Sequence, residues 1–103
     1  MADFIEVAQL ADIPLGTSKL VRVANKDVAL FNVDGTIYAM DDSCAHAGSS
    51  LAAGELKGKM LRCRGHGMMY DVTNGFVNGV PGFGVRSYPV KIQGTKVLIG
   101  IDS

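Results

Sequence analysis

The sequence has no tryptophan, only two cysteines and three prolines, and no excess of either charge. Ten basic residues balance ten acidic ones, so the composition gives no sign of binding to nucleic acid or to an anionic membrane surface. The start of the chain lacks a basic stretch followed by a long apolar run, so we expect no secretory signal. No stretch approaches the roughly 18 apolar residues of a membrane span. We therefore expect a cytoplasmic protein without a membrane partner.

The length of 103 residues suits one domain, and we expect residues 1–103 to form it. A hydrophobic fraction of 48% with 19% charged residues is ordinary for a globular chain with a packed core. Cytoplasmic thiols stay reduced, so two cysteines indicate metal binding or redox chemistry rather than a disulfide.

Short apolar runs separated by turn residues predict an all-β protein with antiparallel sheets. Asp34-Gly35, between residues 28–33 and 36–40, is the strongest hairpin signal, because both central turn positions need a positive φ. Further turns are predicted at residues 25–27, at Asn74-Gly75 and at Gly94-Thr95. Helical signals are weak, with single short turns expected within residues 7–13 and within residues 50–56.

Residues 41–72 differ from the rest because they are rich in glycine and contain every cysteine and histidine of the chain. Two short segments, Cys44-Ala45-His46 and Cys63-Arg64-Gly65-His66, each combine one thiol with one imidazole. This composition predicts a site carried by loops on a β scaffold.

Three interpretations of the two Cys/His pairs compete. The four residues could be unrelated buried side chains, but two tight pairs, each with a glycine close behind it, are hard to obtain by chance. They could bind zinc as a Cys₂His₂ set, although zinc signatures usually pair Cys with Cys and His with His. The third interpretation is a Rieske [2Fe–2S] centre, in which two histidines replace two cysteines on one iron.

The sequence around the two pairs favours the third interpretation. Residues 44–56 and 63–72 resemble the two cluster loops of Rieske ferredoxins, residues 79–82 resemble their proline-containing covering loop, and residues 87–92 resemble their closing strand. The resemblance implies a Rieske fold, with antiparallel sandwich-like or barrel-like sheets. It also implies a small cluster-binding subdomain of two loops, about residues 41–72, inserted in that scaffold.

By the same resemblance, Cys44 and Cys63 are expected to bind the inner iron of one [2Fe–2S] cluster, and His46 and His66 the outer iron. These four are the expected metal and cofactor ligands, and no catalytic residue is expected. Such irons have no open coordination position, which suits electron transfer rather than substrate binding. The chain is therefore expected to be an electron-transfer component and not itself an enzyme.

Residues near the ligands bear on the reduction potential. Ser49 and Gly65 stand where respiratory Rieske proteins have a cysteine pair, so that disulfide cannot form here. Met68 stands where those proteins have a serine that donates to a sulfide, whereas Tyr70 matches a tyrosine that donates to a ligand sulfur. Hydrogen bonds to sulfur stabilise the reduced state. With one donor missing, we expect a potential below about 0 mV, in the low half of the Rieske range.

Four basic residues gather near the second pair: Lys57, Lys59, Arg62 and Arg64. They form either a solvated face or a basic rim that steers an acidic partner.

The resemblance extends to the free ferredoxins of bacterial ring-hydroxylating oxygenase systems. It implies a monomeric one-electron carrier between a flavin-dependent NAD(P)H ferredoxin reductase and a terminal oxygenase. Two alternatives stay open: a small subunit of a larger oxidoreductase such as a nitrite reductase, and a zinc-stabilised module without redox function. A stable stoichiometric complex in cell extract would favour the first, and a colourless protein would favour the second.

Overall fold

The computed structural model describes residues 2–42, 50–63, 68–78, 80 and 83–102. Within these ranges the chain forms ten strands and one short 3₁₀ helix. They are β1 (Ala2–Gln9), η1 (Leu10–Asp12), β2 (Ser18–Val23), β3 (Lys26–Val33), β4 (Thr36–Asp41), β5 (Glu55–Lys57), β6 (Met60–Arg62), β7 (Met69–Asp71), β8 (Ser87–Tyr88), β9 (Val90–Gln93) and β10 (Lys96–Asp102).

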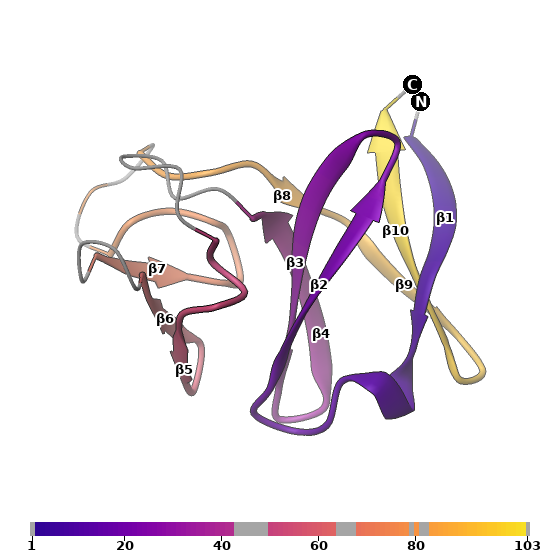
Figure 1. The fold of residues 1–103 in the computed structure, drawn as a ribbon, viewed down its shortest axis with the longest axis horizontal. Helices are drawn as coiled ribbons and strands as arrows, with labels where there is room; N and C mark the ends of the chain where they lie inside the picture. The colour runs from indigo at the N-terminus through magenta and orange to yellow at the C-terminus, as the bar shows by residue number, and fades with distance from the viewer. Residues whose placement is uncertain (1, 43–49, 64–67, 79, 81–82, 103) are drawn as a thin grey trace.

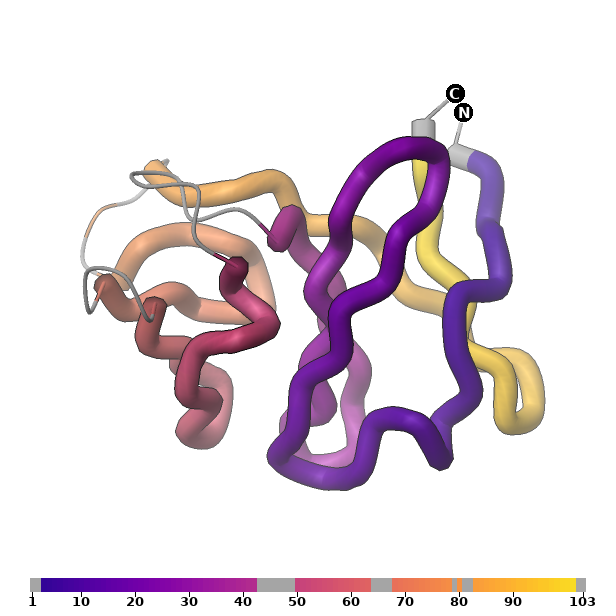
Figure 2. Tube along the Cα trace, in the orientation of Figure 1, coloured from indigo at the N-terminus to yellow at the C-terminus, as the bar shows by residue number. Residues whose placement is uncertain are grey.

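The strands make three antiparallel sheets, which confirms the all-β prediction. Their orders are β1-β10-β9, β2-β3-β4-β8 and β5-β6-β7. Figure 1 shows the second sheet in the middle, with the β5-β6-β7 sheet at one end and the β1-β10-β9 sheet at the other. The two chain ends lie side by side in Figure 2, where β1 pairs with β10.

The predicted hairpin turns are confirmed by the backbone. Asp34 and Gly35 have φ of 52° and 93°, the left-handed conformation that the β3–β4 turn requires. Gly94 has a φ of 62° and connects β9 to β10. The β2–β3 turn lies one residue earlier than expected, at Ala24 and Asn25, and β3 begins at Lys26.

Two local predictions need correction. Within residues 7–13 only η1 is helical, and the preceding residues extend β1, whose register shifts between Glu6 and Ala8. That bulge breaks the two-residue alternation by which a strand is recognised. Residues 50–56 contain no helix, because the end of this segment pairs with β6 as β5. None of the helical structure in the described ranges is long and apolar enough to cross a bilayer.

β3 is buried on both faces because its sheet is the middle layer. Val28 and Leu30 pack into a core shared with β10, whereas Ala29 and Phe31 pack into a second core shared with the β5-β6-β7 sheet. All four side chains are completely buried. This explains the unbroken apolar run at residues 28–31, since a strand covered on both sides does not alternate.

Tyr88 ties β8 to the end of β4. Its hydroxyl donates a hydrogen bond to the Asp41 carboxylate, and the Arg86 guanidinium lies 5.4 Å from its ring centroid. Burial, together with the hydrogen bond to Asp41 and the charge of that carboxylate, raises the pKa of Tyr88 to about 12. The hydroxyl therefore stays protonated and fixes the strand that leads into residues 43–49.

Replacing Tyr88 with Phe is expected to lower the free energy of unfolding by roughly 1.5 kcal/mol near pH 8, because Asp41 loses a donor. The folded pKa lies above the unfolded value of 10.0, so this contribution is complete below pH 10 and is lost as the pH rises toward about 12. Denaturant unfolding between pH 8 and pH 11 should show the difference between wild type and variant narrowing. Tyr38→Phe is the control, and an equal effect in both variants would contradict the assignment to Tyr88.

Candidate metal centre

Of the four expected ligands, Cys63 lies in the described part of the chain. It follows β6 directly, its thiol is free, and only 1% of the residue is exposed. Cys44, His46 and His66 lie outside the described residues, as do Ser49 and Gly65. The structure therefore places one ligand and the backbone on either side of the segments that carry the other three.

The second candidate segment begins and ends at a backbone hydrogen bond. The Cys63 N–H donates to the Met68 carbonyl at 2.7 Å, and the neighbouring residues Arg62 and Met69 are register partners of β6 and β7. Residues 64–67 are thus attached to two backbone positions that are already held together. We call this arrangement the second stem.

The first candidate segment is closed by Asp42, which is only 6% exposed. The Leu51 N–H donates to its backbone carbonyl at 2.6 Å, and the Ala52 N–H donates to its carboxylate Oδ1 at 2.7 Å. The Ser18 hydroxyl then donates to the Ala52 carbonyl at 2.8 Å, which anchors the returning chain on β2. This first stem fixes both ends of residues 43–50.

The two stems meet in one apolar core. Leu51 of the first stem and Cys63 of the second belong to the same buried cluster, together with Leu61 and Tyr70 of the small sheet. Met40, near the end of β4, belongs to this cluster too. Both candidate segments therefore leave the scaffold from neighbouring positions, which is what one shared metal centre requires.

Met68 and Tyr70, which bear on the expected potential, line the same region. Met68 is half-buried against the core cluster, and Tyr70 is completely buried on β7. Tyr70 is therefore more deeply buried than an ordinary aromatic residue of a half-buried strand. Donation from its hydroxyl to a ligand sulfur stays a prediction.

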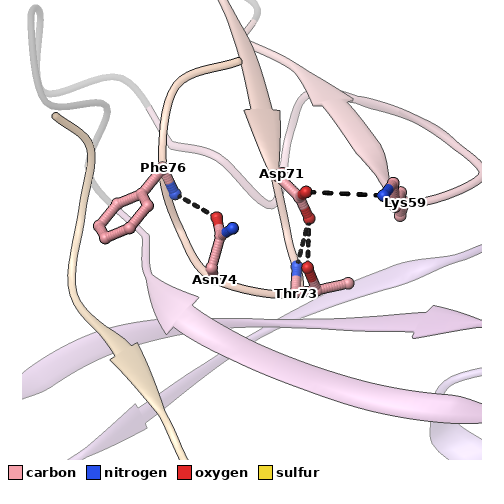
Figure 3. Close-up of polar contacts among 5 residues, drawn as sticks. All are labelled: Lys59, Asp71, Thr73, Asn74 and Phe76. Atoms are coloured by element: carbon pink, nitrogen blue, oxygen red, sulfur yellow. Dashed lines mark hydrogen bonds and ion pairs between the residues drawn. The ribbon is translucent and has the colours of Figure 1, made fainter. Parts of the chain in front are cut away.

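A polar turn follows β7 and supports the predicted bend at Asn74-Gly75 (Figure 3). The Thr73 N–H and hydroxyl donate to Asp71 Oδ1, and the Phe76 N–H donates to Asn74 Oδ1 at 2.8 Å. Burial alone would raise the pKa of Asp71, but the two Thr73 hydrogen bonds and the charge of Lys59 outweigh it and lower that pKa. Asp71 thus stays ionised and orders the turn.

After this turn the chain doubles back through two glycines. The Val85 N–H donates to the Gly75 carbonyl at 2.9 Å, and the Val77 N–H donates to the Phe83 carbonyl at 2.7 Å. A Cβ on Gly84 would collide with the Gly75 backbone, so only glycine fits this crossing. Gly79, Pro81 and Gly82 of the expected covering loop lie outside the described residues, while Val80 is exposed.

Comparison with known proteins identifies the family. A model of the Rieske [2Fe–2S] domain matches residues 3–89. The chain belongs to the Rieske [2Fe–2S] domain family. The Rieske fold expected from the sequence is confirmed by a solved ferredoxin from Sphingomonas yanoikuyae B1, with a TM-score of 0.88 and 26% identity, covering 97% of this chain and 100% of that one.

Two further relatives of this Rieske chain are ferredoxins of dioxygenase systems. It is 35% identical to the ferredoxin component of the naphthalene 1,2-dioxygenase/salicylate 5-hydroxylase systems of a Ralstonia species, over 97% of each chain. It is also similar to a solved complex of reduced oxygenase and oxidized ferredoxin in carbazole 1,9a-dioxygenase, with a TM-score of 0.85 and 27% identity over 94% of this chain and 92% of that one.

The donor set of this Rieske chain fits the cofactor that the family implies. A Rieske [2Fe–2S] cluster takes two thiolates and two imidazoles, and the sequence contains two cysteines and two histidines. Cys63, the described member, is a free thiol buried in the core on which both stems pack. The cofactor of this chain is thus a Rieske [2Fe–2S] cluster, as the sequence led us to expect.

Sequence reasoning missed Asp42. In sequence, Asp41 and Asp42 look like an ordinary polar end of a strand, and the hydrogen bond from Ala52 to Asp42 joins residues ten positions apart. A polar residue shortly before the first ligand was the only signal, and it does not distinguish a stem from a turn.

Asp42→Ala is expected to destabilise the fold by about 1 to 2 kcal/mol and to speed the loss of iron, because the Ala52 N–H loses its acceptor. Asp42→Asn keeps an oxygen acceptor at the same place and should retain iron nearly as well as the wild type. Iron release to a chelator, followed by visible absorbance, measures the difference. Equal iron retention in the two variants would show that the stem does not depend on this side chain.

Proposed function

We propose that this chain is the ferredoxin component of a bacterial ring-hydroxylating dioxygenase system. It receives single electrons from a flavin-dependent NAD(P)H reductase and passes them to the terminal oxygenase. The observation that carries the proposal is the 35% identity, over nearly the full length of both chains, to the ferredoxin component of naphthalene dioxygenase systems. The chain is an electron carrier, and its partners perform the substrate chemistry.

Cys44 and Cys63 hold the inner iron in this proposal, and His46 and His66 hold the outer iron. The burial of Cys63 at 1% exposure supports its inner position, because a thiolate there is shielded from water by the core. Cys63 also adjoins the second stem, so its backbone is held by a hydrogen bond of the scaffold. Neutral imidazoles would be suitable ligands for the outer iron.

When bound to these four ligands, the cluster would supply a one-electron couple. The protein's part is to keep these ligands in one geometry as the charge changes. Both stems serve this purpose, since they tie the ends of the ligand segments to a core in which Leu51, Leu61 and Tyr70 are completely buried. A fixed geometry lowers the rearrangement that must accompany each electron transfer.

Replacing His66 with Ala is expected to abolish normal cluster assembly, because the outer iron loses half of its protein ligands. The wild-type protein, mixed with the reductase and terminal oxygenase of its own source organism, should support NAD(P)H-dependent oxygenase turnover that stops without it. The variant should not restore turnover. A wild-type protein that contains the cluster but passes no electron to the oxygenase would contradict the proposed function.

The reduction potential is expected below about 0 mV, because Met68 replaces a hydrogen-bond donor to a bridging sulfide. Protein-film voltammetry at pH 7 measures this potential directly. Tyr70→Phe should lower it further if the hydroxyl donates to a ligand sulfur, while the matched control Tyr38→Phe should leave it unchanged. A wild-type value near the top of the Rieske range would reject the expectation.

A further inference from the structure

The small β5-β6-β7 sheet has one face on the core and one face turned outward. Leu61 and Tyr70 on its inner face are completely buried. Because side chains alternate along a strand, the register partners on either side of these residues share the outward face. They form two rows, Glu55–Arg62–Met69 and Lys57–Met60–Asp71.

The charges on this face are only partly compensated. Lys59, in the β5–β6 turn, lies 3.9 Å from Asp71 and offsets its charge. Lys57 and Arg62 are exposed and have no ion pair within the described ranges, although Glu55 is the register partner of Arg62. As far as the described residues show, Lys57 and Arg62 are therefore unpaired cations that an external anion can reach.

The same face is hollowed and partly apolar. A shallow depression of about 270 Å³ is lined by Glu55, Lys57, Arg62 and Met69. Met69 and Met60 are half-buried on this outward surface. Arginine and methionine are enriched at protein interfaces, and methionine adapts its shape to a partner. The depression is thus lined by one adaptable apolar side chain, Met69, together with two basic side chains and one acidic side chain.

Two of the residues that line the depression, Arg62 and Met69, adjoin the second stem. Arg62 directly precedes Cys63, and Met69 directly follows Met68, so one row of the face adjoins the second stem. A protein seated here would lie beside the stem that carries Cys63, one of the expected ligands. Figure 1 shows that β9, with its own exposed lysine at position 91, lies at the other end of the molecule.

We propose that the outward face of the β5-β6-β7 sheet is a docking surface for an acidic patch on the terminal oxygenase. The inference rests on the proposed function and adds the location and the charge of the contact. The oxygenase is the occupant because a similar ferredoxin forms a solved complex with its oxygenase. Lys57 and Arg62 attract the acidic partner over a distance, and Met60 and Met69 then pack against its apolar side chains.

Charge reversal tests the surface. The cluster-loaded variants Lys57→Glu and Arg62→Glu are reduced and mixed with the oxidised oxygenase of the source organism in a stopped-flow instrument at several salt concentrations. The second-order rate of electron transfer should fall about five- to tenfold at low salt and approach the wild-type rate at high salt, where charges are screened. Lys91→Glu changes the net charge equally on β9 and should leave the rate unchanged.

Further readouts separate the explanations. Each variant should keep the wild-type reduction potential and electron paramagnetic resonance spectrum. If the change at Arg62 disturbs the adjacent ligand Cys63, the Lys57→Glu variant alone decides the result. Equal slowing by Lys91→Glu would mean that only net charge matters, and no slowing in any variant would also overturn the proposal. If the variants accept electrons from the reductase more slowly but pass them to the oxygenase at the wild-type rate, the assignment to the oxygenase is wrong. If the wild type itself reduces no oxygenase, the proposed function fails instead.

Discussion

Two hydrogen-bonded stems on one apolar core are the constraint on which the metal centre of this protein depends. Its candidate ligands come from two segments with sixteen residues between them. Bringing such segments together costs conformational entropy, and the cost is lower when each segment's ends are already joined. Asp42 joins the first segment to Leu51 and Ala52, and the Cys63 N–H joins the second to Met68. The shared core cluster then brings the two stems together.

The middle sheet explains how a chain of 103 residues supports this arrangement. β3 contributes side chains to two cores, so the same strand stabilises the scaffold on one face and the metal-binding end on the other. Tyr88 extends this support to the end of β4 through Asp41. The small β5-β6-β7 sheet consequently needs only one buried face, and its other face is available for a partner.

Much of this fold follows from local sequence signals, and the rest depends on contacts between distant residues. Asp34-Gly35 and Gly94 predict their hairpins because their turns need a positive φ that few residues adopt. The Cys/His pairs predict the cofactor because few metal sites mix these ligands in that way. β1 was not predicted because the bulge between Glu6 and Ala8 interrupts its alternation. β5 was not predicted because it pairs with β6, which was itself not predicted. Asp42 could not be identified, since its role exists only once the chain returns to Ala52.

The central claim is that thiolates and imidazoles from two separate segments share one diiron centre in this chain. Iron and acid-labile sulfide analysis of the anaerobically purified protein, combined with electron paramagnetic resonance after dithionite reduction, tests it most directly. The account predicts about two irons and two sulfides per chain, with a signal typical of a [2Fe–2S] cluster that has two histidine ligands. A protein that contains zinc, or no metal and no sulfide, would contradict it.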